Sequence, residues 1–181
     1  RKSPFTNSGW GNPANVTTPQ GLYMVGSMQR NGKGASGIAR VNVKDAKWEV
    51  ILKDGGPGHH EFDHMCYDSK RNRILHFGMK SRRIHTFDLK TKKWQRVKEA
   101  AKGPAKYTGG SCYVPVIDAV CLIMSTDRRK PDTFYIFKVE EGRWYTTPYK
   151  GARMGRPNSH GLAHDLHYDP ELNIFIYTGY K

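Results

Sequence analysis

The stretch from His64 to Trp94 decides the fold, and it reads HMCYDSKRNRILHFGMKSRRIHTFDLKTKKW. Short runs of alternating apolar residues predict strands at 64–68, 73–77, 84–88 and 94–97. Polar segments rich in Lys, Arg, Ser, Thr and Asn separate these runs, as expected for tight turns. Four short strands joined in sequence by short connections predict an antiparallel meander.

The same cycle recurs along the chain at a nearly constant spacing. A tyrosine followed five residues later by asparagine or aspartate occurs three times, at Tyr67–Asn72, Tyr113–Asp118 and Tyr168–Asn173. A tryptophan after an alternating run also occurs three times, at Trp48, Trp94 and Trp144, which lie 46 and 50 residues apart. A repeat of roughly 40 to 50 residues that contains four strands is typical of a β-propeller blade.

The repeat divides the chain into units. We expect an extended N-terminal arm over residues 1–20 and an all-β propeller over 21–181, with blades at 21–57, 58–104, 105–157 and a partial one at 158–181. The innermost strand of the first blade, if present, would lie before Gln20. Three and a half blades do not close a ring, so the chain is expected to be a segment of a larger propeller. Its open ends would promote self-association unless further blades cover them.

Composition limits the classes of partner. The chain has 181 residues and a formal net charge of +14, from 30 Lys and Arg against 16 Asp and Glu. Such a charge favours polyanions such as acidic polysaccharide or nucleic acid. No apolar run reaches the roughly 18 residues that a membrane span needs. Three cysteines, Cys66, Cys112 and Cys121, form no even disulfide framework, so buried free thiols are expected, with a Cys66–Cys112 link as the alternative.

The pattern resembles the Kelch-type β-propellers, the galactose-oxidase and Kelch-like group. The resemblance rests on Tyr67-Asp68, Asn72 to Gly78, Phe87-Asp88-Leu89 and Trp94, and it is echoed from Tyr168 to Gly179. The sequence departs from that family at the double glycine, because Gly78 is followed by Met79 and Met124 replaces the glycine of the third unit. The resemblance implies four-stranded blades, and it permits binding, scaffolding or enzymatic roles.

The candidate site residues lie in loops expected at one end of the propeller. The loops that enter each blade hold six of the eight histidines: His59, His60, His64, His160, His164 and His167. The loops between the second and third strands hold the cationic side chains of Arg82, Arg83, Arg128, Arg129 and Lys130. Arginine binds carboxylate, sulfate and phosphate through two parallel hydrogen bonds. We therefore expect ligand binding by His59, His60, His160, His167 and these cations.

Three interpretations of the histidines stay open. They could bind a divalent ion such as Zn²⁺ or Ca²⁺. The spacing of the histidines matches no metal-binding motif, and no other cofactor is expected. They could transfer protons near neutral pH. They could instead form a structural polar ring between neighbouring blades.

The main functional hypothesis is a module that binds a polyanion or a protein partner and performs no catalysis. The first alternative is a lyase that cleaves acidic polysaccharide by β-elimination. There, Arg82 or Arg129 would neutralise the carboxylate, His64 or His164 would act as base, and Tyr107 as acid. The second alternative is a Kelch-like scaffold. A polysaccharide ligand would favour a secreted or periplasmic location, and a scaffold would favour the cytoplasm.

Overall fold

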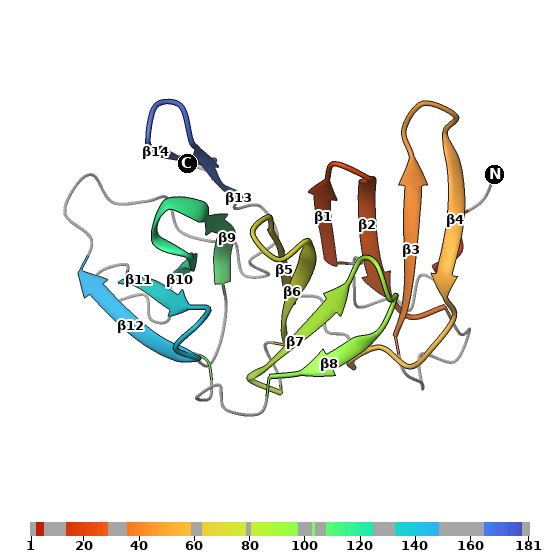
Figure 1. Ribbon diagram of the computed structural model, residues 1–181, viewed down its shortest axis with the longest axis horizontal. Helices are drawn as coiled ribbons and strands as arrows, with labels where there is room; N and C mark the ends of the chain where they lie inside the picture. The colour runs from red at the N-terminus through yellow and green to blue at the C-terminus, as the bar shows by residue number, and fades with distance from the viewer. Residues whose placement is uncertain are drawn as a thin grey trace.

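The computed structural model describes residues 3–5, 14–28, 36–58, 63–78, 81–97, 103, 108–124, 133–148 and 165–178. These residues form four antiparallel sheets that follow one another along the chain, three with four strands and one with two (Figure 1). We call the sheets blade 1 (β1–β4), blade 2 (β5–β8), blade 3 (β9–β12) and the fourth unit (β13–β14). Each sheet is a meander, because the strands pair in sequence order. The fold is therefore a set of β-propeller blades, as the repeat predicts.

The strands are short and similar in length. Their bounds are β1 Ala14–Thr18, β2 Gly21–Gly26, β3 Gly37–Asn42, β4 Lys47–Leu52, β5 His64–Asp68, β6 Arg73–Gly78, β7 Arg83–Asp88, β8 Trp94–Arg96, β9 Thr108–Val114, β10 Ala119–Met124, β11 Thr133–Lys138, β12 Arg143–Pro148, β13 Asp165–Asp169 and β14 Ile174–Thr178. One 3-10 turn, η1 (Pro115–Ile117), connects β9 to β10. The described part of the chain has no helix that is long and apolar enough to cross a membrane.

The first blade begins earlier than the predicted boundary at residue 21. Strand β1 lies inside the range assigned to the N-terminal arm and pairs with β2 from Ala14–Val25 to Thr18–Gly21. The sequence hides this strand because Thr17 stands where the other units have a tyrosine, and Gln20 stands where they have the asparagine or aspartate of the turn. Residues 14–18 thus belong to blade 1 and not to an arm, and blade 1 has all four strands.

The asparagine and aspartate of the repeat close the turn between the first two strands. Asn72, Asp118 and Asn173 have φ angles of 48°, 47° and 53°, in the left-handed region that these residues tolerate better than most. The tyrosine five residues earlier donates its hydroxyl hydrogen to the same side chain: Tyr67 to Asn72 at 3.1 Å, Tyr113 to Asp118 at 2.7 Å and Tyr168 to Asn173 at 2.7 Å. The repeated Tyr–Asn/Asp spacing therefore reflects one local hydrogen bond that fixes the turn in each of these three units.

The remaining repeated residues form a row across each blade. In blade 2 the cross-strand partners Tyr67, Ile74, Phe87 and Trp94 lie side by side on one face. The matching row of blade 3 is Tyr113, Val120, Phe137 and Trp144. The Phe–Trp ring pairs have almost the same geometry in both blades, with centroids 5.0 Å and 5.1 Å apart and interplanar angles of 47° and 45°. This row packs against the preceding blade.

The opposite face of each blade packs against the blade that follows. Cys66 and Leu75 of blade 2 join the cluster that contains the Tyr113 row, and Cys112 and Cys121 of blade 3 pack with Leu166 of the fourth unit. The three cysteines form no disulfide bond with one another, and all are buried. The alternative Cys66–Cys112 link is wrong, because strand alternation turns Ser111 towards Cys66 (Sγ to Oγ, 3.2 Å) and Cys112 towards the fourth unit.

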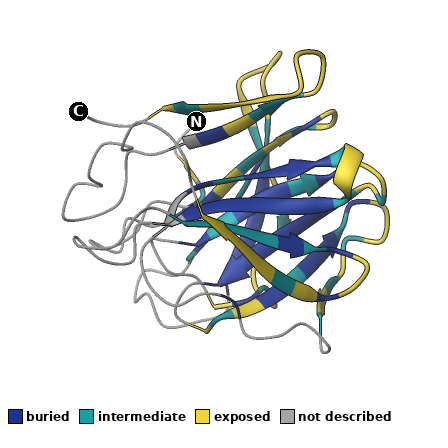
Figure 2. Ribbon diagram, turned by 90° about the vertical axis from the view of Figure 1, so that its left-hand side faces the viewer, coloured by how far each residue is buried: buried dark blue, intermediate teal, exposed yellow. Residues whose placement is uncertain are grey.

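The core therefore lies between the blades. Tyr23, Val25 and Ile38 of blade 1 are fully buried with Ile74 and Phe87 of blade 2. Figure 2 shows the buried residues along the strands and exposed residues in the turns at one end of the sheets. The connections between strands are therefore exposed, and the faces of the strands pack against neighbouring blades.

Candidate functional site

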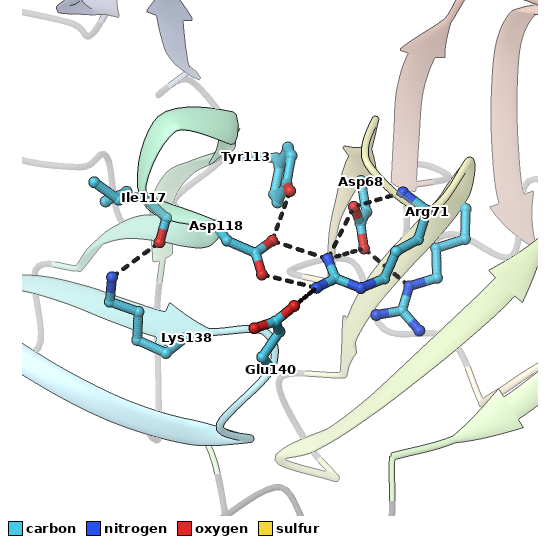
Figure 3. Close-up of polar contacts among 8 residues, drawn as sticks. Asp68, Arg71, Tyr113, Ile117, Asp118, Lys138 and Glu140 are labelled. Atoms are coloured by element: carbon cyan, nitrogen blue, oxygen red, sulfur yellow. Dashed lines mark hydrogen bonds and ion pairs between the residues drawn. The ribbon is translucent and has the colours of Figure 1, made fainter.

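A cluster of polar side chains centres on Arg71, in the turn between β5 and β6 (Figure 3). The carboxylate of Asp68 begins this turn and has no exposed surface. It accepts a hydrogen bond from the backbone N–H of Arg71 at 3.2 Å and one from Nε of Arg73 at 2.9 Å. Nη1 of Arg71 lies 3.2 Å from the same carboxylate. Because burial penalises an unpaired charge, these two arginines compensate Asp68.

Arg71 also connects blade 2 to blade 3. Its guanidinium donates two parallel hydrogen bonds of 2.8 Å to the carboxylate of Asp118, and a third of 3.0 Å to Glu140. Tyr113 donates to the same Asp118 carboxylate. Bidentate pairing between a guanidinium and a carboxylate is strong and geometrically specific. We call Asp68, Arg71, Tyr113, Asp118 and Glu140 the Arg71 cluster.

The cluster changes the acidity of its members. The Arg71 guanidinium, together with the Tyr113 hydroxyl, lowers the pKa of Asp118 to about 2. Burial, together with the hydrogen bond to Asp118, raises the pKa of Tyr113 above its usual value. Hydrogen bonding to Asp118 raises the pKa of Arg71. All three groups are therefore held in their ordinary charge states near neutral pH, which suits the cluster to stabilising the contact between blades.

A simpler version of this contact joins blade 1 to blade 2. Nε2 of Gln20 donates to Oδ1 of Asn72 at 3.3 Å, so the turn of blade 1 reaches the left-handed residue of the next blade. Arg71 does the same towards Asp118. In both contacts, a side chain in the turn of one blade binds the left-handed residue of the next blade. The turns at this end of the blades, which we call the turn end, therefore have a structural role.

A second group of titratable side chains is buried between blades 1 and 2, near the opposite end of the strands. Nε2 of His76 lies 3.2 Å from Oδ2 of Asp63, and both side chains are almost fully buried. His85 is the cross-strand partner of His76, with the ring centroids 6.1 Å apart. Burial, and then the nearby His76, lower the pKa of His85 to about 4. Trp94 meets His76 edge to face at 6.0 Å. His76 and Asp63 are buried by packing, whereas His85 is half-buried.

Four of the predicted site residues fall in the described structure, and they do not form one group. His64 begins β5 and is half-buried as the cross-strand partner of Phe77. Arg82 has a φ of 56° and donates from Nε to the carbonyl of Gly103 at 2.6 Å, so it holds the connection between blades 2 and 3. Arg83 is exposed beside it. His167 is exposed in the middle of β13, on the face that turns away from blade 3.

The other predicted site residues lie outside the described residues: His59, His60, Tyr107, Arg128, Arg129, Lys130, His160 and His164. Within the described ranges, no three His, Cys, Asp or Glu side chains are placed to hold a metal ion.

Sequence reasoning missed two features of the site, and only the second left a signal in the sequence. The partners of Arg71 in blade 3 are 47 and 69 residues away, so no local pattern links them. A weaker signal was available in Gly56-Pro57 and Gly103-Pro104, a repeated pair 47 residues apart. The N–H groups of Gly56 and Gly103 donate to the carbonyls of Ser36 and Arg82, and the two glycines lie against Trp94 and Trp144. These glycines leave space for the tryptophan of the next blade.

Comparison with known proteins supports the fold. No protein-family model and no curated protein matches the chain. A crystal structure described as a nidogen/laminin complex is similar with a TM-score of 0.58 and 11% identity, over 93% of this chain and 55% of the solved one. An acylaminoacyl peptidase from Pyrococcus horikoshii gives a TM-score of 0.43 at 14% identity, over 88% of this chain and 30% of that chain. The first likeness is to a β-propeller and shows the fold alone, and this chain spans about half of that solved chain.

Proposed function

We propose that the chain is a propeller module that binds an acidic polymer through exposed cations, with acidic polysaccharide as the ligand class. The observation that carries the proposal is a group of exposed lysines at the turn end of blades 1 and 2: Lys44, Lys47, Lys70, Lys90 and Lys93. No ion pair shorter than 4.0 Å engages these five in the described structure, whereas Arg71 at the same end is fully paired. Unpaired cations on one surface attract polyanions over several ångströms.

Acidic residues divide the turn end into two halves. The turns of blade 3 and the fourth unit carry Glu140, Glu141 and Glu171. The acids beside the lysines are Asp45 of blade 1, to which Asn42 donates at 3.0 Å, and Asp88 of blade 2, which accepts from the backbone N–H groups of Lys90 and Thr91. A polyanion would therefore lie over blades 1 and 2. Arg83, exposed at the opposite end, supports the competing placement on the predicted His- and Arg-rich face.

The test compares the two ends of the propeller. Binding of polygalacturonate and dextran sulfate is measured at low and at physiological salt for three variants: Lys90→Glu with Lys93→Glu, Arg83→Glu, and Lys90→Arg with Lys93→Arg. We expect the first to weaken binding by about tenfold or more, equivalent to about 1.4 kcal/mol, and the charge-preserving pair to leave it unchanged. Weakening by Arg83→Glu alone would move the site to the opposite end. No salt-sensitive binding by the unmodified chain would overturn the proposal.

A protein partner is the second candidate, because the similar propeller was solved in a complex described as nidogen/laminin. The Kelch resemblance of the repeat agrees with a protein-binding role. Binding of acidic proteins but not of polysaccharides would favour it. The lyase alternative would appear in the same assay as an ultraviolet absorbance from unsaturated sugar product.

A further inference from the structure

Two of the three cysteines face each other across neighbouring strands of blade 3. Cys112 of β9 and Cys121 of β10 are directly opposed cross-strand partners. Their side chains therefore lie on the same face of the sheet, in one buried cluster with Leu166 of the fourth unit. The two residues stand nine positions apart in the sequence, and the register of the hairpin brings them together.

The other units have no second thiol at this position. The equivalent cross-strand pairs are Val16–Tyr23 in blade 1, Cys66–Leu75 in blade 2 and His167–Ile176 in the fourth unit. Packing between blades therefore does not require two cysteines there. Cys66 is a buried thiol at the same position of blade 2 that lies opposite a leucine, so it serves as an internal control.

The geometry of an antiparallel pair brings the two side chains close to bonding distance. Directly opposed residues have Cβ atoms roughly 4.5–5.5 Å apart, and a disulfide needs roughly 3.5–4.5 Å. Closing this difference requires a movement of about 1 Å. A disulfide formed in this way is strained, and strained disulfides are the ones that thiols reduce readily. The bond would therefore be reversible.

Strand β9 is built to make such a movement. Among the described strands it pairs with β10 alone, at the edge of its sheet. Gly109 and Gly110 stand shortly before Cys112, and Gly110 has a φ of 148°, which favours glycine. The pairing of β9 with β10 also shifts here, since Ile123 lies opposite Gly110 and Met124 opposite Thr108. Such an irregularity loosens the ladder beside the two cysteines.

We propose that Cys112 and Cys121 form a redox-sensitive dithiol, and that its reversible oxidation to a disulfide controls the packing of the fourth unit on blade 3. The oxidant is a small disulfide, with oxidised glutathione as the probe. The Cys112 sulfur attacks it and releases one reduced glutathione, and the Cys121 sulfur then attacks Cys112 and releases the second. One disulfide forms, one is reduced, and the two thiol protons pass to the two released thiols.

The burial of the two sulfurs favours this order of attack. Cys112 is 9% exposed and lies on the edge strand, so local movement of β9 brings it to the oxidant first. Cys121 is 2% exposed, and burial raises the pKa of its thiol to about 11. Cys121 therefore carries little thiolate and reacts second, within the hairpin.

The bond would change the contact with the fourth unit because both sulfurs belong to that contact. Strand β13 lies beside β9 (Figure 1), and its Leu166 is 1% exposed in the cluster with the two cysteines. Protein interiors are close-packed, so drawing the sulfurs together displaces atoms that Leu166 packs against. Oxidation should therefore loosen β13, and reduction should restore it.

Peptide mapping of the full chain tests the bond. The chain is equilibrated at several ratios of oxidised to reduced glutathione, quenched with acid, alkylated and digested with trypsin. Both cysteines fall in one tryptic peptide, residues 107–128, and Cys66 falls in another. Under oxidising conditions we expect the 107–128 peptide to lack two hydrogens and carry no alkyl group, while Cys66 stays alkylated. Excess reduced glutathione should restore both thiols. Two alkylated thiols at every ratio, or a disulfide that includes Cys66, would overturn the proposal.

Variants and hydrogen exchange test the order of attack and the effect on packing. Cys121→Ser should stop at a mixed disulfide of Cys112 with glutathione, and Cys66→Ser should behave as the unmodified chain does. In the unmodified chain, amides of β13 should exchange at least about tenfold faster after oxidation, with those of β6 unchanged. Equal exchange of β13 in the two forms would contradict control of the fourth unit. Circular dichroism checks folding, and alanine replaces serine in any variant that unfolds.

Discussion

Blade 2 and the fourth unit are built from the same repeat, and they differ in what covers them. In both, the tyrosine donates to the asparagine of the turn, at 3.1 Å in blade 2 and 2.7 Å in the fourth unit. Leu75 of blade 2 is 1% exposed, whereas Ile176 at the matching position of the fourth unit is 45% exposed. The repeat motif thus fixes local turn geometry without help from neighbours, while burial depends on the adjacent blade.

The largest expected difference concerns these two apolar side chains. Leu75→Ala removes buried methyl groups and leaves a cavity between blades 2 and 3, so it should lower the free energy of unfolding by about 2 to 5 kcal/mol. Ile176→Ala, at low protein concentration, should cost less than about 1 kcal/mol. Chemical denaturation of the two variants measures both. Equal losses would mean that a neighbour covers the fourth unit as it covers blade 2.

A second comparison is between the ion pairs of Arg71, which include the buried Asp68, and the exposed ion pair of Arg40 with Glu49. Arg71→Ala leaves Asp68 with Arg73 as its remaining cation and breaks the contact to blade 3, so we expect a loss of about 1 to 3 kcal/mol. Arg40→Ala removes an exposed pair with Glu49 within blade 1 and should cost about 0 to 1 kcal/mol. Urea denaturation of both variants measures the difference, and a larger loss for Arg40→Ala would refute the role given to Arg71.

The Arg71 cluster should also make stability depend on pH. The pKa of Asp118 is lowered to about 2 in the folded chain, so its stabilising effect is present above the ordinary carboxyl pKa and is lost as the pH falls from about 4 to 2. Asp118→Asn should flatten the fall in stability over that window by about 1 to 2 kcal/mol. Thermal unfolding at a series of pH values gives the slope. An unchanged slope in Asp118→Asn would contradict the assignment.

The smallest expected effect separates buried from exposed copies of the tyrosine motif. Tyr113→Phe leaves Asp118 without one donor in a buried setting and should cost about 1 kcal/mol. Tyr168→Phe removes a more exposed bond to Asn173 and should cost about half as much or less. The measurement is the midpoint of thermal unfolding for the two variants, with Tyr67→Phe as an intermediate case. A reversed order would show that burial does not govern the motif.

The sequence predicts the elements of blade 2 closely because its strands alternate and its turns have residues with strong preferences. The expected ranges 64–68, 73–77, 84–88 and 94–97 differ from β5–β8 by at most one residue at any boundary. It fails at β1, where Thr17 and Gln20 replace the repeated residues. A local sequence pattern can identify a strand of this repeat only where the strand and its turn contain the repeated residues.

The candidate site was less accessible to sequence reasoning because its contacts are not local. Spacing could place Arg82 in a loop, but it could not show that its side chain binds the carbonyl of Gly103. It could not show that Arg71, in an ordinary polar turn, binds carboxylates from another blade. The exposed lysines at the turn end were visible as charges, but only the folded chain shows that no ion pair of the described residues engages them.

Hydrogen exchange at low protein concentration tests the central claim most directly, namely that each blade face is protected by the blade that follows. Amides of β6 and β14 that bond to the preceding strand are compared in the same sample. The account predicts that β14 exchanges by local opening, about 100-fold or more faster than β6, which opens only with the larger unit. Equal protection of β6 and β14 in a monomeric sample would contradict it.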